Sequence, residues 1–226
     1  MIKLTPRLQC VADMTPQAAC VADIGTDHAY LPIYLVLNKK AEKAVACDIR
    51  KGPLESALSN IKHYGLCDKI KTVLCDGLAG LEDGQVQTAV IAGMGGELIA
   101  SIINARPDAA QEYILQPMSK ISTLRKSLQE NGFKIDEEAL ALEGEKLYTV
   151  MRVKKGHQNW SEHELVFSPA LREHPLYGVF LQKHFDSVSC NLENIRQSGN
   201  SKVIKIFEEK KAEAENEIRK FGGEIK

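Results

Sequence analysis

Short apolar runs alternate with longer, helix-compatible stretches between Cys20 and Val153. This alternation is typical of βαβ units that build a mostly parallel sheet covered by helices. Seven runs predict strands, at about residues 20–24, 43–48, 70–75, 87–92, 112–116, 133–142 and 146–153. The last two runs are separated only by residues 143–145, whereas a parallel crossover needs about a dozen residues. We therefore predict a doubly wound, Rossmann-like α/β fold whose seven-stranded sheet has an antiparallel last strand.

The pattern changes after Lys155, where two long stretches carry stripes of positions spaced alternately three and four residues apart. The stripes are Leu181, Phe185, Val188, Leu192 and Ile195, and then Ile204, Phe207, Lys211, Ala214, Ile218 and Phe221. A spacing that averages 3.5 residues is typical of a coiled-coil seam. Between the stripes, Gly199 and Asn200 can take the positive φ that reverses a helix. We predict a domain over residues 1–155 and an antiparallel helical coiled-coil hairpin over residues 156–226, whose stripes can also be read simply as the core of a helical subdomain.

The chain is close to neutral, with 29 Lys and Arg against 30 Asp and Glu. This balance excludes a global positive field of the kind that dominates non-specific nucleic-acid binding, so any such contact must be a local patch. The candidate basic residues are Arg7, Arg50, Lys51, Lys62, His63, Lys120, Arg125, Lys126, Lys154 and Lys155.

Cysteine and histidine spacing gives no sign of a metal site. The six cysteines form no CxxC pair, which favours reduced thiols in a cytoplasmic protein, and the six histidines show no HxxxH pattern. The N-terminal residues show no secretory pattern, and no apolar stretch approaches the roughly 18 residues that a membrane span needs. We expect no metal and no membrane partner.

The exit of the first predicted strand, Asp23-Ile24-Gly25-Thr26-Asp27-His28, predicts a cofactor loop at the switch point of the sheet. The dinucleotide fingerprint GxGxxG is absent, because Asp27 and Tyr30 replace its second and third glycines. Two carboxylates would repel a pyrophosphate but suit a cationic ligand such as S-adenosylmethionine, whose carboxylate the loop amides and His28 can meet. Asp27 can alternatively be the N-cap of the following helix.

The next two strand ends carry further acidic residues. Asp48, followed by Ile49, comes 23 residues after Gly25, near the offset of roughly 20 residues at which an acidic side chain receives ribose hydroxyls. Asp76 and Gly77 can offer an oxygen to an adenine amino group and an amide to its ring nitrogen. Each Asp can also simply begin a turn, but three successive strand ends of this kind together favour a nucleoside site.

The fourth and fifth strand ends predict the space around a transferred methyl group. Ala92-Gly93-Met94-Gly95-Gly96 offers no polar group to hold an amine, but it leaves room beside the methyl, with Met94 as an apolar wall. The glycines can alternatively serve close helix packing. Gln116 and Pro117 either face the same cleft or only end a strand.

Several strings in the chain resemble the bacterial tRNA (adenine-N1)-methyltransferases that modify adenine 22 in the D-arm. They are ADIGTDHAYLPIYL (22–35), CDIRKGPLESALSNIKHYGL (47–66), CDGL (75–78), AGMGGELI (92–99) and LQPM (115–118). The sheet with an antiparallel last strand is also the one associated with class I methyltransferases. The resemblance implies an enzyme that uses S-adenosylmethionine to form 1-methyladenosine in tRNA. We further expect a cytoplasmic protein that is a monomer or weak homodimer.

The resemblance also implies roles for individual residues. Adenine N1 can attack the methyl directly if the base is unpaired or flipped out, and Asp27 can stabilise the positive charge that develops on it. Tyr30 is the candidate for stacking on the base, or else a core aromatic, and Asn60 can bond cofactor or base. We further expect Met94 at the catalytic centre. We expect Arg7, Tyr30, Gly95, Gln116 and Pro117 on the substrate side.

Two rival interpretations remain from the sequence. One is a small-molecule or protein methyltransferase. The other is a catalytically inactive coiled-coil interaction protein on a nucleotide-binding fold.

Overall fold

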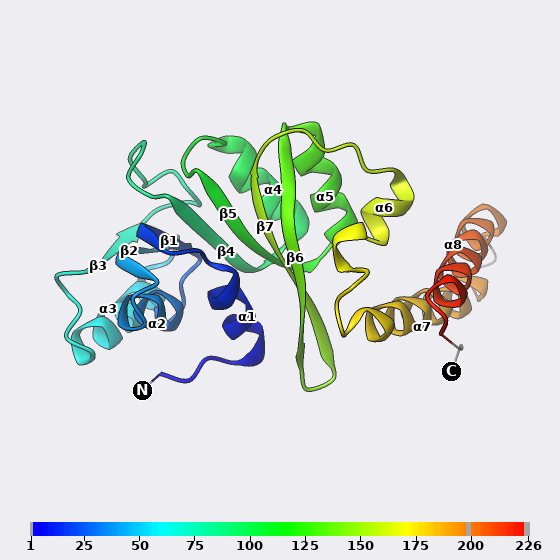
Figure 1. Ribbon diagram of the computed structural model, residues 1–226, viewed down its shortest axis with the longest axis horizontal. Coiled ribbons are helices and arrows are strands. Elements are labelled where there is room, and N and C mark those ends of the chain that lie inside the picture. Colours follow the sequence, from blue (N-terminus) through cyan, green and yellow to red (C-terminus); the bar gives the residue numbers. More distant parts are fainter. Residues whose placement is uncertain (1, 198–199, 224–226) are drawn as a thin grey trace. The chain divides into compact units, whose positions relative to one another are not determined.

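The computed structural model describes residues 2–197 and 200–223, and its larger part is built on a seven-stranded sheet (Figure 1). The strands are β1 (Ala18–Ile24), β2 (Ala41–Asp48), β3 (Ile70–Leu74), β4 (Thr88–Gly95), β5 (Glu112–Ser119), β6 (Phe133–Glu143) and β7 (Lys146–Lys155). Their order in the sheet is β3-β2-β1-β4-β5-β7-β6, with β1 to β5 parallel and β7 antiparallel to both of its neighbours. The predicted fold class and the final hairpin are confirmed.

Helices cover both faces of this sheet because each strand alternates its buried side chains between two cores (Figure 1). In β1, Ala22 and Ile24 belong to one core and Val21 to the other. The first core contains α4 (Gly96–Ala105) and α5 (Ile121–Glu130), and the second contains α1 (Pro6–Met14), α2 (Tyr30–Leu37) and α3 (Lys51–His63). Helix α1 is not among the predicted elements. It begins at Pro6, with Thr5 as its N-cap.

The chain divides into two compact units, one ending at Leu171 and the other beginning at Arg172. The sheet does end at Lys155, but residues 156–171, with α6 (Glu162–Val166) and the 3₁₀ turn η1 (Pro169–Leu171), belong to the first unit. The boundary therefore lies later than the sequence pattern indicated.

Arg125 is the physical reason for this later boundary. Its buried side chain donates to the Glu138 carboxylate at 2.9 Å and to the carbonyl oxygens of Leu165 (2.9 Å) and Val166 (3.1 Å). These bonds attach the α6 segment to α5 and β6. Arg125 is 1% exposed and is therefore not a surface contact for RNA, contrary to its place among the basic candidates.

The second unit contains α7 (Tyr177–Arg196) and α8 (Ser201–Lys220), which pack as an antiparallel pair. Arg196 bonds Glu208 at 2.9 Å near one end, and the Tyr177 and Phe221 rings meet edge to face near the other. Six of the predicted stripe residues, Leu181, Phe185, Val188, Leu192, Ala214 and Ile218, are buried. The others are less so: Ile195, Ile204, Phe207 and Lys211 are partly buried, and Phe221 is 49% exposed. Asn200 has a φ of −79° and caps α8 through Val203, so it does not take the predicted positive φ, while Gly199 lies outside the described residues.

Candidate active site

Two adjoining cavities lie at the carboxyl ends of the parallel strands, where β1 pairs with β2 on one side and with β4 on the other. In open α/β sheets this switch point is where ligands bind. Gly25, Ala92 and Gly93 line both cavities, so one extended ligand can reach from one to the other.

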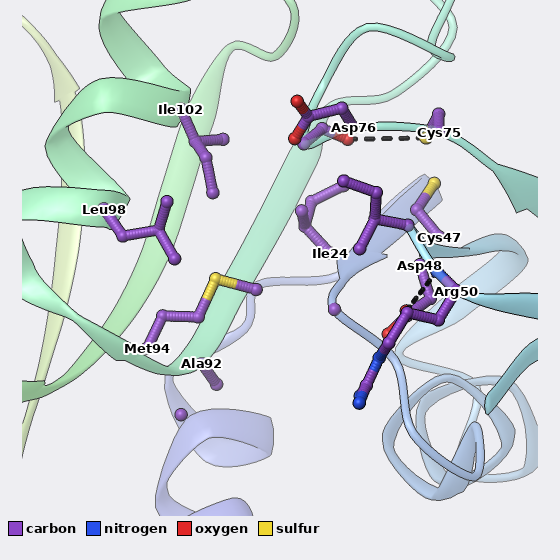
Figure 2. A pocket seen from close by; sticks show the side chains of 14 residues that line it. Ile24, Cys47, Asp48, Arg50, Cys75, Asp76, Ala92, Met94, Leu98 and Ile102 are labelled. Atoms are coloured by element: carbon purple, nitrogen blue, oxygen red, sulfur yellow. Dashed lines mark hydrogen bonds and ion pairs between the residues drawn. The ribbon is translucent and has the colours of Figure 1, made fainter. Parts of the chain in front are cut away.

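The first cavity, of about 370 Å³, brings together the ends of the first four strands and the start of α4 (Figure 2). It is lined by Ile24, Gly25, Cys47, Asp48, Ile49, Arg50, Cys75, Asp76, Gly77, Ala92, Gly93, Met94, Leu98 and Ile102. All of the predicted nucleoside residues from Asp48 to Gly93 are in this set. Leu98 and Ile102 are not among the predicted site residues. Their four-residue spacing directly after a glycine-rich strand end is the signal that could have indicated them.

Asp48 is held in place by its own turn. Its carboxylate is 6% exposed and accepts the backbone N–H of Arg50 at 2.8 Å, with the Arg50 guanidinium 3.6 Å away. Gly77 has a φ of +53°, and a Cβ there would lie 3.0 Å from Ile102. Gly77 is therefore required both by its backbone conformation and by the close approach of α4.

The loop after β1 is fixed by backbone bonds and by one side chain from α3. The N–H groups of Gly25 and Thr26 both donate to the Cys47 carbonyl at 2.8 Å. The Asn60 amide donates to the His28 carbonyl at 2.9 Å. Asn60 lines neither cavity, and its bond to His28 holds the loop, so its predicted bond to cofactor or base stays a prediction.

Ala29, and not Asp27, is the N-cap of α2. It has a φ of +55° and no side-chain cap bond, which is an unfavourable conformation for a residue with a Cβ. The alternative interpretation of Asp27 as a helix cap is therefore not supported. The left-handed turn directs the chain so that residues 26–31 border the second cavity.

The second cavity, of about 300 Å³, gathers charged and aromatic side chains beside the shared glycines. Its lining residues are Arg7, Leu8, Asp23, Gly25, Thr26, Asp27, His28, Ala29, Tyr30, Leu31, Ala92 and Gly93. Burial raises the pKa of Asp23 to about 6, and the neighbouring Asp48 carboxylate acts in the same direction. The more exposed Asp27 carboxylate lies 3.3 Å from His28 Nε2, and the His28 and Tyr30 rings stack at 5.5 Å.

Gln116 is fully buried and lines neither cavity. Its Oε1 accepts from Arg7 Nη1 at 2.6 Å and from the Gly93 N–H at 3.1 Å, and its amide nitrogen donates to the Pro117 carbonyl at 3.0 Å. Gln116 therefore holds Arg7 and Gly93 in position, and its predicted contact with substrate stays a prediction. The Arg7 guanidinium also lies over the Tyr148 ring, 5.6 Å from its centroid.

The glycines at the end of β4 and the start of α4 have different roles. Gly93 needs a positive φ of +79°. A Cβ on Gly96 would lie 2.5 Å from the Lys120 carbonyl oxygen, so Gly96 serves close packing, as the alternative interpretation proposed. Gly95 and Pro117, both predicted to contact substrate, line neither cavity. A Cβ on Gly95 would meet only Ser119 Oγ at 3.5 Å.

Over residues 2–197 and 200–223, no three His, Cys, Asp or Glu side chains form a group that could hold a metal ion. In the same residues, no helix has the length and apolar character of a membrane span.

Comparison with known proteins gives consistent results for sequence and structure. A family model described as a methyltransferase domain matches residues 4–151. The tRNA (adenine(22)-N(1))-methyltransferase of Bacillus subtilis (strain 168) is 37% identical over 83% of this chain and 78% of its own length.

Two solved structures are similar over nearly the whole chain. A protein of the NADB-Rossmann superfamily from Streptococcus agalactiae has a TM-score of 0.88 and 34% identity, covering 95% of this chain and 97% of its own. The M. capricolum TrmK, solved with the cofactor product S-adenosyl-homocysteine, has a TM-score of 0.84 and 28% identity, covering 96% and 98%. From its sequence similarity, its matched domain and the geometry of its site, this chain belongs to the tRNA (adenine(22)-N(1))-methyltransferase family.

Proposed function

We propose that this protein transfers the methyl group of S-adenosylmethionine to N1 of adenine 22 in the D-arm of tRNA, in the cytoplasm, and so forms 1-methyladenosine. The observation that carries the proposal is the pair of cavities that meet at Gly25, Ala92 and Gly93. One cavity has the polar groups and apolar walls that suit a nucleoside. The other has the opposite charges that suit an amino acid and an open side from which a base can enter.

The first cavity fits the adenosine part of the cofactor. Asp48 presents a buried, oriented carboxylate that can accept two ribose hydroxyls. Leu98 and Ile102 give a flat base an apolar wall in this cavity (Figure 2), and Ile102 lies close to Gly77. When bound, S-adenosylmethionine supplies an electrophilic methyl group on a sulfonium.

The second cavity fits the amino-acid part of the cofactor. Asp23 lies at its buried side, where a carboxylate favours an ammonium group, and Arg7 offers a guanidinium to a carboxylate. Gln116 and Tyr148 fix the position of Arg7, so little side-chain entropy is lost when it binds an anion. We therefore extend the role of Arg7 from a tRNA contact to an anion ligand within the site.

The rim of the second cavity suits the target base. Tyr30 is 44% exposed and stacks on His28, which leaves an aromatic surface beside the shared glycines. Adenine N1 has an in-plane lone pair, so the protein's main task is to hold a flipped or unpaired base in line with the methyl group. The Asp27 carboxylate at the same rim can stabilise the positive charge that the product ring carries.

The proposal is tested by incubating the protein with labelled S-adenosylmethionine and bulk bacterial tRNA, followed by nucleoside analysis. Label in 1-methyladenosine, lost when adenine 22 of a transcript is replaced by guanine, is the expected result. Label in a small molecule or a protein would instead support the first rival function. Failure to bind S-adenosylhomocysteine would support the inactive scaffold. Sedimentation analysis distinguishes a monomer from the weak homodimer that the sequence also allows.

A further inference from the structure

Two cysteines lie side by side in the nucleoside cavity. Cys47 is the penultimate residue of β2, and Cys75 directly follows β3, the neighbouring parallel strand. Cys47 is in register with Val73, so Cys75, two residues further on, points to the same face of the sheet. Both side chains line this cavity, and Figure 2 shows their sulfur atoms at the same wall.

The two thiols differ in their surroundings. Cys47 is fully buried, and burial raises its pKa above the usual value for a thiol. Cys75 is partly exposed, and its Sγ lies 3.5 Å from the Gly77 carbonyl oxygen. A Cβ on Gly80 would lie 2.8 Å from this sulfur, so the chain is tightly packed on that side. A reagent that enters the cavity therefore meets Cys75 first.

We propose that Cys47 and Cys75 form an oxidation site at which a peroxide closes a disulfide bond when the cofactor is absent. The thiolate of Cys75 attacks a peroxide oxygen and the O–O bond breaks. The released hydroxide takes a proton, which leaves a sulfenic acid on Cys75 and one water molecule. The Cys47 sulfur then displaces the sulfenic hydroxide, which leaves with the Cys47 proton as a second water molecule. The protein loses two electrons and two protons, and a hydrogen peroxide molecule becomes two molecules of water.

The position of the bridge gives it a consequence for binding. It joins the strand ends that carry Asp48 and Asp76, so it constrains the turn that must receive the nucleoside. A nucleoside in this cavity in turn covers the path to Cys75. Because coupling between two events is reciprocal, the bridge weakens cofactor binding by the same factor by which bound cofactor disfavours the bridge. This inference rests on the proposed cofactor site.

The test uses the full chain with the two exposed thiols, Cys67 and Cys190, replaced by Ser, so that surface oxidation does not contribute. The protein is treated with hydrogen peroxide with and without saturating S-adenosylhomocysteine. Peptide mass spectrometry then measures the 47–75 cross-link, and calorimetry measures S-adenosylhomocysteine affinity before and after oxidation. We expect cross-linking in the free protein, about tenfold less of it with ligand, and about tenfold weaker affinity after oxidation that dithiothreitol restores.

Cys75→Ser in the same background is the matched control, with every oxidised sample compared with its own untreated protein. It removes the cross-link and the loss of affinity together if the pair is responsible. The inference is overturned by oxidation of Cys75 to the sulfinic acid without a bridge, by equal cross-linking with and without ligand, or by an affinity unchanged within twofold. A reduced protein that does not bind S-adenosylhomocysteine would contradict the proposed function instead, and the cross-link yield alone would then decide whether the thiols pair.

Discussion

Asp23 is a buried charged residue in the lining of the second cavity, one residue before the end of β1 and 8% exposed. Burial raises its pKa to about 6, so in the free protein it takes up a proton just below neutral pH. A cationic ammonium group beside it favours the ionised form and lowers this pKa again. At pH 5, binding of a ligand with an ammonium group must therefore remove a proton from Asp23, whereas at pH 7 Asp23 is already ionised.

This linkage predicts that affinity for S-adenosylhomocysteine falls as the pH is lowered from 7 to 5, by up to about tenfold. Calorimetry in buffers of different ionisation enthalpy should show a proton released on binding near pH 5.5. Asp23→Asn should bind more weakly at pH 7 and lose most of this pH dependence. An unchanged pH profile in that variant would assign the titration to another group, and Asp23 would then not contact the ammonium.

Arg7 offers a test of which anion the second cavity receives. Arg7→Met keeps an unbranched side chain against Tyr148 but removes the charge. It should weaken binding of S-adenosylhomocysteine by about tenfold or more, because a charge-assisted hydrogen bond is lost. Methylthioadenosine, which has no carboxylate, should bind both proteins equally. If only tRNA affinity falls, Arg7 contacts a phosphate, as the sequence alone suggested.

Gly93 and Gly95 lie two residues apart, and the same substitution to Ala at each position gives a matched comparison. Gly93→Ala forces a side chain into left-handed backbone, which costs about 1–2 kcal/mol, and places a Cβ 3.7 Å from Arg7 Nη1. Gly95 has a φ of −66° and only an ordinary contact with Ser119. We expect Gly93→Ala to weaken cofactor binding and Gly95→Ala to retain stability and turnover. A large loss of turnover in Gly95→Ala would restore the substrate role predicted from the sequence.

At the level of elements, the five parallel strands could be predicted because buried parallel strands leave short runs of apolar residues. The antiparallel ending followed from the length of a single loop. Helix α1 could not be predicted, because its stripe of Val11, Ala12 and Met14 is short and interrupted by polar residues.

For the site residues, the sequence could not predict the direction in which each side chain points. Asp48 and Asp76 point into a cavity because strand ends fix their direction. Gln116 and Asn60 instead turn toward the backbone or toward Arg7, and only the three-dimensional contacts distinguish a residue that binds a ligand from one that holds the loop which binds it. The spacing of Asp residues along the sequence indicated the nucleoside site, but it does not distinguish a ligand-binding side chain from one that supports a loop.

Arg125 joins three elements, so its removal should affect the fold more than the site. Arg125→Met leaves Glu138 as a buried, unpaired carboxylate and removes the donors to Leu165 and Val166. We expect denaturant unfolding to show a loss of about 3–5 kcal/mol. The double variant Arg125→Met with Glu138→Leu should recover part of this loss, since it removes the buried charge. No recovery would mean that the bonds to the two carbonyl oxygens dominate.

At the scale of the whole molecule, both cavities are built entirely from the unit that ends at Leu171, while the helical pair begins after it. The cofactor and the methyl transfer therefore need the first unit. The near-neutral charge of the chain leaves tRNA docking to local contacts and shape. A role for α7 and α8 in docking can be separated from a role in folding by choosing where the chain is cut.

A chain ending at Leu171 keeps every acceptor of Arg125, whereas a chain ending at Lys155 keeps Glu138 but loses the carbonyl oxygens of Leu165 and Val166. We expect the chain ending at Leu171 to retain a folded circular dichroism spectrum and to bind S-adenosylhomocysteine like the full chain. At subsaturating tRNA it should methylate tRNA at least about a hundredfold more slowly, which corresponds to a loss of about 3 kcal/mol of binding free energy. The chain ending at Lys155 should unfold at lower denaturant, because it exposes the buried pair of Arg125 and Glu138. Undiminished methylation by the chain ending at Leu171 would refute the docking role and would assign recognition of the D-arm to the rim of the active site itself.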